Sequence, residues 1–389
     1  VIHIGGIPVE FPFQPYGTQL AFMNRVISTL DRSQKEGHCY ALLESPTGTG
    51  KTLSLLCSAL AWQQNQKLKN LQECLTHSAS RADPEAMTDP INHGGGFIPE
   101  AQSSGNPMSP PPPAKSSIRE KKRAVPTIFY SSRTHAQISQ VIREYRKTTY
   151  RVSMAVLGSR RHYCTNQYIR GTDNLDEQCK LLLKNRESCP EFKNANKVKS
   201  HPSIQKGGCH EVHDIEDLVK IGQEVKGCSY FAARSMAQDA ELVFCPYNYI
   251  MHPLIRDAME VNISQNIIIF DEAHNIEDIA RDAGSVDLDE EALLHLQNEL
   301  TQLSINDGDT YQPLFEMTQD ILNWIDRKVP TLSKREFQRH CSCWTGDKAL
   351  KELQEANLTL QNFAILYECA RKVLLRKKRS ALLDQILNL

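Results

Sequence analysis

The 389-residue sequence contains no hydrophobic run near the roughly 20 residues that a membrane-spanning helix needs. It also lacks the charged and apolar segments of a secretory signal peptide, although it begins with Val1 rather than Met, which leaves room for an upstream piece. The twelve cysteines are therefore expected to be buried thiols or metal ligands in a reducing compartment rather than disulfides. We expect no membrane association.

The sequence has no excess of either charge, because its formal net charge is −1. This balance excludes a global attraction to nucleic acid, so any nucleic-acid binding must use local basic patches. A hydrophobic content of 40% suits a globular core, and the length suits about two or three domains.

A phosphate-binding loop is predicted just after residues 39–43, an apolar run typical of a short buried strand. Apolar positions of a helix follow the loop, which completes the strand–loop–helix context of a P-loop. The loop consists of Ser45, Pro46, Thr47, Gly48, Thr49, Gly50, Lys51 and Thr52. The two glycines let backbone N–H groups turn toward phosphates, Lys51 would reach the β- and γ-phosphates, and Thr52 would ligate Mg²⁺. A glycine-rich turn before a core helix is the alternative, because Ser45 replaces the first glycine of the general pattern.

A second catalytic segment follows the apolar run at residues 266–270, which is typical of a central parallel strand. Asp271 and Glu272 stand at its carboxyl end, where open α/β sheets bind ligands. Asp271 would hold Mg²⁺, and Glu272 would orient and deprotonate the attacking water. The alternative is an acidic helix N-terminus. Together with the P-loop, these carboxylates predict hydrolysis of a nucleoside triphosphate.

Strand-like and helical patterns alternate between the two motifs, with further strands predicted at residues 127–130, 154–157 and 242–244. This alternation predicts an α/β fold, a parallel sheet with helices on both faces. Residues from about 65 to 125 interrupt it with glycines, prolines and polar residues, and we expect a flexible insertion there. The basic triplet at 121–123 is either a nuclear import signal or a solvated charge run.

Five cysteines lie among basic and polar residues between positions 164 and 228: Cys164, Cys179, Cys189, Cys209 and Cys228. Because the sequence has no Cys-x-x-Cys pair, spacing alone does not choose among a zinc site, an iron–sulfur cluster and ordinary core cysteines. Cys57 and Cys245, in apolar surroundings, are predicted to be small buried hydrophobic residues.

Taken together, these motifs resemble the iron–sulfur DNA helicases of superfamily 2, the group that contains the xeroderma pigmentosum group D helicase. The segment from Phe11 to Gln19 is similar to that family's adenine-recognition segment, with Gln19 as the amide that would read the base. Residues 45–52 are similar to the family's P-loop, including its serine, and residues 271–274 match its DEAH box. The resemblance implies that His274 couples the nucleotide site to a second motor lobe.

The resemblance also assigns ligands and DNA contacts. Four cysteines would hold a 4Fe–4S cluster: Cys164, Cys179, Cys189 and Cys228. Cys209 matches a position that the family does not use as a ligand. Residues along the bound single strand would include Arg133, Thr134, His135, Arg160 and Arg161, and solvated surface arginines are the alternative for part of this set.

The implied organisation is a first part of RecA-like motor lobe 1, a P-loop NTPase lobe, at 1–150, an iron–sulfur insert at 151–235, the rest of the lobe at 236–285 and the start of a helical arch at 286–389. The implied function is an ATP-dependent 5′–3′ DNA helicase of DNA repair in the nucleus, acting on single-stranded or forked DNA with possible repair proteins as partners. No second lobe follows within 389 residues, so we expect this stretch alone to bind ATP and hydrolyse it poorly. The alternatives are a zinc-containing ATPase that remodels RNA or protein, an RNA helicase, and a non-enzymatic truncated binding module.

Overall fold

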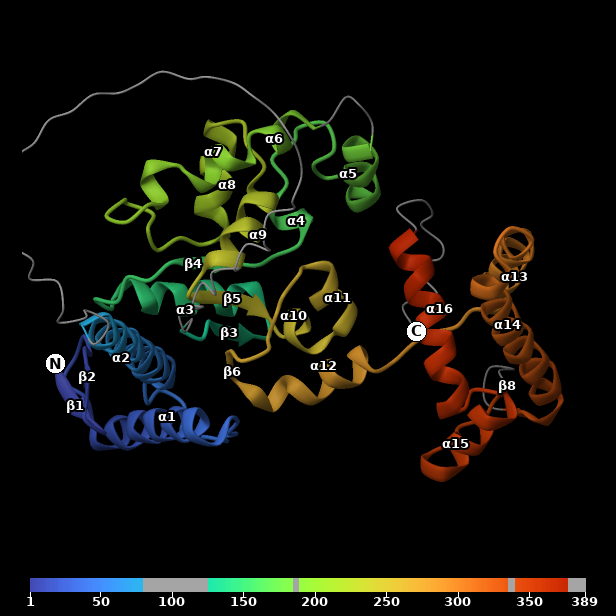
Figure 1. Cartoon of the computed structure of the whole chain (residues 1–389), viewed down its shortest axis with the longest axis horizontal. Coiled ribbons are helices and arrows are strands. Elements are labelled where there is room, and N and C mark those ends of the chain that lie inside the picture. Colours follow the sequence, from blue (N-terminus) through green and yellow to red (C-terminus); the bar gives the residue numbers. More distant parts are fainter. Residues whose placement is uncertain (80–124, 185–188, 335–339, 377–389) are drawn as a thin grey trace, which may run out of the picture. The chain divides into compact units, whose positions relative to one another are not determined.

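The computed structural model describes residues 1–79, 125–184, 189–334 and 340–376 (Figure 1). Its contacts divide the chain into two compact units, Val1–Ile279 and Ala280–Leu389, which are described one at a time. Among the described helices, none combines the length and hydropathy that a bilayer crossing requires.

A parallel four-stranded sheet forms the centre of the first unit, in the order β4-β5-β3-β6. Its strands are β3 (Ile128–Ser132), β4 (Met154–Val156), β5 (Leu242–Pro246) and β6 (Ile267–Phe270). Each is a run that the sequence predicts as a strand, with ends that differ by one or two residues. The predicted α/β class with a parallel sheet is therefore confirmed.

Helices cover both faces of this sheet because side chains alternate along each strand. One face carries Ile128 and Tyr130 into a core shared with β1 (Ile2–Ile4), β2 (Ile7–Val9), α1 (Gly17–Glu36), α2 (Lys51–Ala79) and α3 (His135–Arg146). The other face carries Phe129 and Val243 into a second core with α10 (Asn248–Met251) and α11 (Pro253–Ala258). Cys57 and Cys245 are fully buried, as predicted.

A small helical region lies between β4 and β5 in sequence. Its elements are α4 (Arg160–Tyr163), α5 (Leu175–Lys184), α6 (Pro190–Lys193), α7 (Ala195–Lys199), η1 (Pro202–Ile204), α8 (Ile215–Glu224) and α9 (Ser229–Asp239). Tyr163, Leu218 and Tyr230 are buried in a core that belongs to this region. The region therefore has apolar packing of its own.

The second unit is mostly helical. η2 (Ala273–Asn275) and α12 (Ile276–Ala283) lead to it along the chain. Its elements are α13 (Glu290–Ser304), α14 (Gly308–Lys328), η3 (Val329–Thr331), β7 (Ser333–Lys334), β8 (His340–Cys341), α15 (Gly346–Glu355) and α16 (Leu360–Arg376). Leu296, Leu300 and Leu314 pack with Cys369 and Val373 in its core.

Three details differ from the sequence predictions. Residues 39–43 form no strand, and Tyr40 and Leu42 are 87% and 92% exposed. β6 is an edge strand rather than a central one, since β3 is its only partner among the described strands. A strand buries its side chains only where neighbouring strands flank it and other elements cover its faces, and the described residues supply no such neighbour for 39–43.

Residues 65–79, expected in the flexible insertion, continue α2 because they are rich in good helix formers. The rest of that insertion, with the basic triplet, lies outside the described residues.

Candidate functional site

The P-loop turns on two glycines with left-handed backbone, Gly48 at φ +80° and Gly50 at φ +72°. Its side chains bond within the loop, since Ser45 Oγ and Thr49 Oγ1 lie 2.7 Å apart and Thr49 Oγ1 donates to Pro46 O at 2.8 Å. The loop leads directly into α2 at Lys51, so the backbone N–H groups of this helix N-terminus adjoin it. This is the arrangement that the sequence predicts for a phosphate cradle, apart from the missing strand.

Lys51 lies across this loop. Its Nζ donates to the carbonyl oxygens of Ser45 and Pro46 at 2.9 and 3.4 Å. The ammonium is thus held over the loop, where a phosphate oxygen could take the place of either carbonyl. A charge-assisted bond to phosphate is stronger than a bond to a neutral carbonyl.

Gln19 is bonded to the loop rather than directed into open space. Its Oε1 accepts from Tyr16 N at 3.0 Å, and its Nε2 donates to Thr49 O at 3.0 Å. The residue is only 8% exposed. Gln19 therefore links the start of α1 to the P-loop, and its role in reading a base stays a prediction.

Gly50→Ala is expected to weaken nucleotide binding and to lower stability by about 1–3 kcal/mol, the usual cost of a strained backbone conformation. The added Cβ would lie 2.5 Å from Gln19 Nε2, so the Gln19–Thr49 bond would have to break. Fluorescent-ATP titration and thermal unfolding measure the two effects. Gly37→Ala is the matched control, because Gly37 has φ +85° with nothing near its Cβ position and should lose stability alone. Unchanged nucleotide affinity in Gly50→Ala would contradict the prediction.

The carboxyl end of β6 meets the P-loop through Tyr130. This tyrosine is fully buried, and its hydroxyl lies near the side chains of Thr52 and Asp271 without an aligned hydrogen bond to either. Burial raises the pKa of the Asp271 carboxyl, the charge of Glu272 adds to this, and nearby Lys51 opposes it. The fold therefore brings Asp271 close to Lys51 and Thr52, which lie about 220 positions earlier in the sequence.

This group fits a hydrated Mg²⁺. Its donor set is hard oxygen, a hydroxyl from Thr52 and a carboxylate from Asp271, which is what Mg²⁺ prefers. The buried Tyr130 hydroxyl lacks a partner, and a metal-bound water could supply one. Tyr247 also donates through its hydroxyl to the Asp271 carbonyl oxygen, which fixes the backbone at the strand end.

Three of the four predicted cluster cysteines lie at helix ends. Cys164 follows α4, Cys189 and Cys228 are the N-cap residues of α6 and α9, and Cys179 lies inside α5. Burial and, to a smaller extent, the thiols of Cys189 and Cys164 raise the pKa of the Cys228 thiol to about 12. Cys164 is perturbed in the same direction by burial and then by its neighbours Cys179 and Cys189. Cys164 therefore lies near the other three thiols, and Cys228 also lies near Cys189.

Backbone N–H groups near three of these sulfur atoms partly offset the effect of burial on the thiol pKa values: Asn166 near Cys164, Phe192 near Cys189 and Phe231 near Cys228. Hydrogen bonds of this kind stabilise metal-bound thiolates. The donor set of three buried thiols and the half-buried Cys164 thiol thus fits a thiolate-held metal group. In the part of the chain that the structure describes, no three metal-ligating side chains converge on a single-ion position. Cys209 is exposed, as are Cys341 and Cys343.

Asn166 and Glu191 surround Cys189, and the sequence reasoning missed both. Asn166 Nδ2 donates to Cys189 Sγ at 3.3 Å and to Glu191 Oε2 at 2.9 Å, and the Cys189 thiol lies 3.2 Å from the same carboxylate oxygen. Glu191 O also accepts from Cys228 N at 2.7 Å. The only signal in the sequence was that each polar residue lies two positions from a cysteine. The contact between Asn166 and Cys189 spans 23 positions and follows only from the fold.

Arg160 contacts two other segments of the helical region between β4 and β5. Its guanidinium carbon lies 4.5 Å from the centre of the Tyr230 ring, and its Nη1 lies 2.9 Å from Asp176 Oδ1. Because these partners flank Cys228 and Cys179, and Arg160 itself precedes Cys164, one side chain joins three cysteine-bearing segments. Arg161 is the exposed member of the pair.

The three residues after β3 that are predicted to contact single-stranded DNA also differ in their surroundings. Thr134 caps α3 by accepting from Gln137 N, and His135 is packed against His162 with 4.4 Å between ring centres. Burial and then His162 lower the pKa of His135 to about 4, so the ring is neutral near pH 7. Arg133 is exposed and donates to Asn275 Oδ1 at 2.9 Å.

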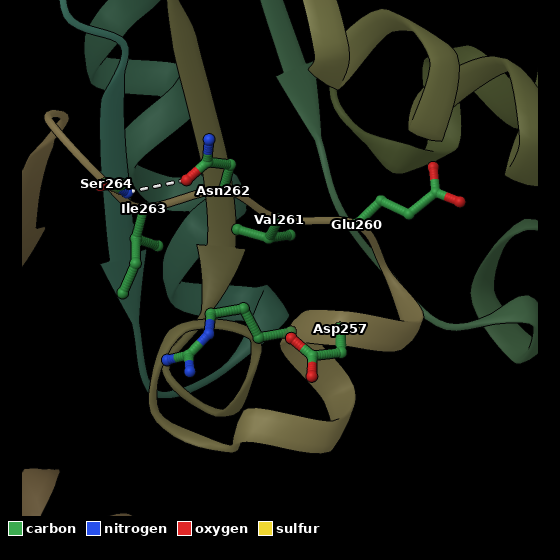
Figure 2. Close-up of a pocket in the computed structure, with 7 residues that line it drawn as sticks. Asp257, Glu260, Val261, Asn262, Ile263 and Ser264 are labelled. Atoms are coloured by element: carbon green, nitrogen blue, oxygen red, sulfur yellow. Dashed lines mark hydrogen bonds between the residues drawn. The ribbon is translucent and has the colours of Figure 1, made fainter. Parts of the chain in front are cut away.

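A separate hollow of about 610 Å³ lies beside α11, lined by residues 256–257 and 260–264 (Figure 2). Asn262 Oδ1 accepts from Ser264 N at 3.0 Å on its wall, and Glu260 is paired with Arg234 at 3.5 Å. No residue predicted from the sequence as functional lines it. This hollow therefore plays no part in the phosphate or cysteine sites.

Comparison with known proteins gives consistent likenesses. A sequence profile of the DEAD_2 family matches residues 130–293. The chain is similar to the Fanconi anemia group J protein homolog of Gallus gallus, at 28% identity over 97% of this chain and 40% of that protein. It is 39% identical to the Regulator of telomere elongation helicase 1 homolog of Drosophila yakuba and 38% identical to that of Arabidopsis thaliana, each over 73% of this chain and 27% and 25% of those proteins.

Solved structures of a truncated XPD and an XPD helicase also match, with TM-scores of 0.40 and 0.41 at 14% identity. They cover 94% and 96% of this chain, which in turn covers 79% and 50% of theirs. The chain spans well under half of the length of the sequence relatives named above.

Proposed function

The chain belongs to the superfamily 2 helicases of the xeroderma pigmentosum group D, telomere-elongation regulator and Fanconi anaemia group J type, and on that premise we propose that it carries the ATP-binding lobe of a 5′–3′ DNA helicase acting in DNA repair. Residues 56–64 and 274–278 resemble the group J member in particular. The direction of movement and the repair role come from the family resemblance.

The approach of the P-loop to the end of β6 carries this proposal. Lys51 and Thr52 come from the start of α2, Asp271 comes from the end of β6, and the Tyr130 hydroxyl lies near both Thr52 and Asp271. A lysine for phosphate and two oxygen ligands for Mg²⁺ are the shared parts of P-loop nucleotide hydrolysis. If residues 45–52 were only a glycine-rich turn before a core helix, a carboxylate beside them would have no function.

The chain's own residues then have separate tasks. Lys51 would leave the carbonyls of the loop to bind the β- and γ-phosphates, and Thr52 and Asp271 would hold Mg²⁺. When bound, Mg²⁺ neutralises charge on the phosphates. Glu272, next to Asp271 and 39% exposed at its side chain, accepts the proton of the attacking water.

In the insert we propose a 4Fe–4S cluster held by Cys164, Cys179, Cys189 and Cys228. The buried thiols and the N–H groups aimed at them support a thiolate-bound group, and the family resemblance selects the cluster over zinc. The cluster would stabilise the insert, since the metal joins four separate segments of chain.

The same proposal covers the division of the chain. Residues 1–150 and 236–285 would be motor lobe 1, residues 151–235 the insert and residues 286–389 the start of the arch. Single-stranded or forked DNA would follow exposed basic side chains such as Arg133 and Arg161, in a salt-sensitive mode. We propose a nuclear location, with repair proteins as partners.

Nucleotide binding by the chain tests this function most directly. Lys51→Ala is expected to lower affinity for fluorescent ATP at least about tenfold, since it removes the charge-assisted phosphate contact. Lys67→Ala is the matched control, because Lys67 lies on the same helix and pairs with Glu241. Equal affinity in wild type and Lys51→Ala would favour a non-enzymatic binding module. In the full-length protein, stimulation of hydrolysis by RNA but not DNA would indicate an RNA helicase.

A further inference from the structure

Asn275 joins the exposed arginine after β3 to the carboxylate after β6. Arg133 Nη1 donates to Asn275 Oδ1 at 2.9 Å, and Asn275 Nδ2 lies 3.0 Å from His274 Nε2. His274 Nδ1 in turn lies 3.4 Å from Glu272 Oε2. β3 and β6 are paired parallel strands, so the segments after them meet at one edge of the sheet.

The chemistry of these side chains decides which group donates and which accepts in each of these contacts. A guanidinium only donates, so Asn275 must present its oxygen to Arg133 and its NH₂ group to the imidazole. The imidazole Nε2 must then accept, which places the proton of the neutral ring on Nδ1. That N–H faces the Glu272 carboxylate.

Asn275 also holds the Glu272 backbone. Glu272 has φ +57°, a left-handed conformation that side-chain-bearing residues rarely adopt. Its carbonyl oxygen accepts from Asn275 N at 3.2 Å and from Asn275 Nδ2 at 3.3 Å. Both hydrogens of the amide are thus used, one on the imidazole and one on this carbonyl. A strained backbone that its surroundings hold in place is a feature of functional sites.

We propose that Asn275 is a positioning residue that couples DNA contact at Arg133 to the orientation of Glu272; this inference rests on the proposed function. Arg133 has five N–H donors, and within the described ranges its guanidinium hydrogen-bonds to Asn275 Oδ1 alone, so it can contact a DNA phosphate while keeping Asn275. A DNA phosphate bound to Arg133 would hold its guanidinium, and through it the Asn275 amide, in place. His274 and Glu272 are then held in one orientation, with the carboxylate placed to take the proton of water.

The test is ATP hydrolysis by the full-length protein with and without saturating oligo-dT. Asn275→Ala is expected to reduce the DNA stimulation of kcat at least about tenfold, a fraction of what a general base supplies. KM for ATP and the oligo-dT affinity, measured by anisotropy, should stay at wild-type values. Asn275→Asp keeps the acceptor for Arg133 but loses both donors, and it should lose stimulation as well. Asn306→Ala, at an exposed asparagine in the second unit, is the control.

Wild-type stimulation in both Asn275 variants would overturn the coupling. Loss of stimulation together with oligo-dT affinity or thermal stability would overturn it too, because Asn275 would then be a binding or structural residue. If wild type itself hydrolyses no ATP and Lys51→Ala binds nucleotide equally well, the proposed function fails, and the coupling fails with it. The nucleotide-binding comparison separates that case from failure of the coupling alone.

Discussion

Glu272→Gln is expected to lower ATP hydrolysis by the full-length protein by about 10²–10⁴-fold, the usual contribution of a general base, while ATP still binds. The amide has the size of the carboxylate but cannot accept a proton from water. The backbone bonds from Asn275 to the Glu272 carbonyl do not involve the side chain and should persist. Single-turnover hydrolysis and fluorescent-ATP titration measure the two quantities separately.

Glu224→Gln is the matched control for this variant. It makes the same change of charge at an exposed position of α8, and it should hydrolyse ATP at the wild-type rate. The Glu272 assignment fails if Glu272→Gln hydrolyses ATP as fast as that control. A parallel loss of ATP affinity would instead assign Glu272 to nucleotide or metal binding.

The sheet of the first unit could be predicted because each of its strands is a short apolar run bounded by polar residues. The prediction failed for residues 39–43, whose composition is equally apolar. A strand is stable only beside another strand, and composition does not say whether a neighbour is present. The same limit explains β6, whose uninterrupted isoleucines suggest a central strand although β3 alone pairs with it among the described strands.

The site could be predicted where short motifs carry it and could not where contacts span long sequence distances. The loop at 45–52 and the carboxylates at 271–272 are read directly from sequence order. Tyr130, between Thr52 and Asp271, looks like one more residue of a buried strand until the fold places its hydroxyl. Arg160 shows the same limit, since its bond to Asp176 and its stacking on Tyr230 depend on the fold, while its predicted DNA contact stays a prediction.

Cys228→Ser is expected to remove the metal from the insert and to expose the insert to proteolysis. Serine has nearly the size of cysteine and is a good N-cap residue, so α9 should keep its start. Its hydroxyl does not replace a thiolate ligand, and the other three thiols belong to segments that the metal would join. The variant therefore separates loss of the metal from loss of local helix structure.

Metal content and absorption after anaerobic purification measure this effect. Wild type should carry about four irons per chain with absorption in the visible blue, as a 4Fe–4S cluster requires, and Cys228→Ser should lose both. Cys209→Ser, at an exposed thiol, should keep the cluster. Cys245→Ser, in the fully buried core of β5, should lose stability but keep the iron, which distinguishes ligand loss from a structural cost. Zinc in place of iron in wild type would overturn the cluster, and iron retained in Cys228→Ser would remove Cys228 from the ligand set.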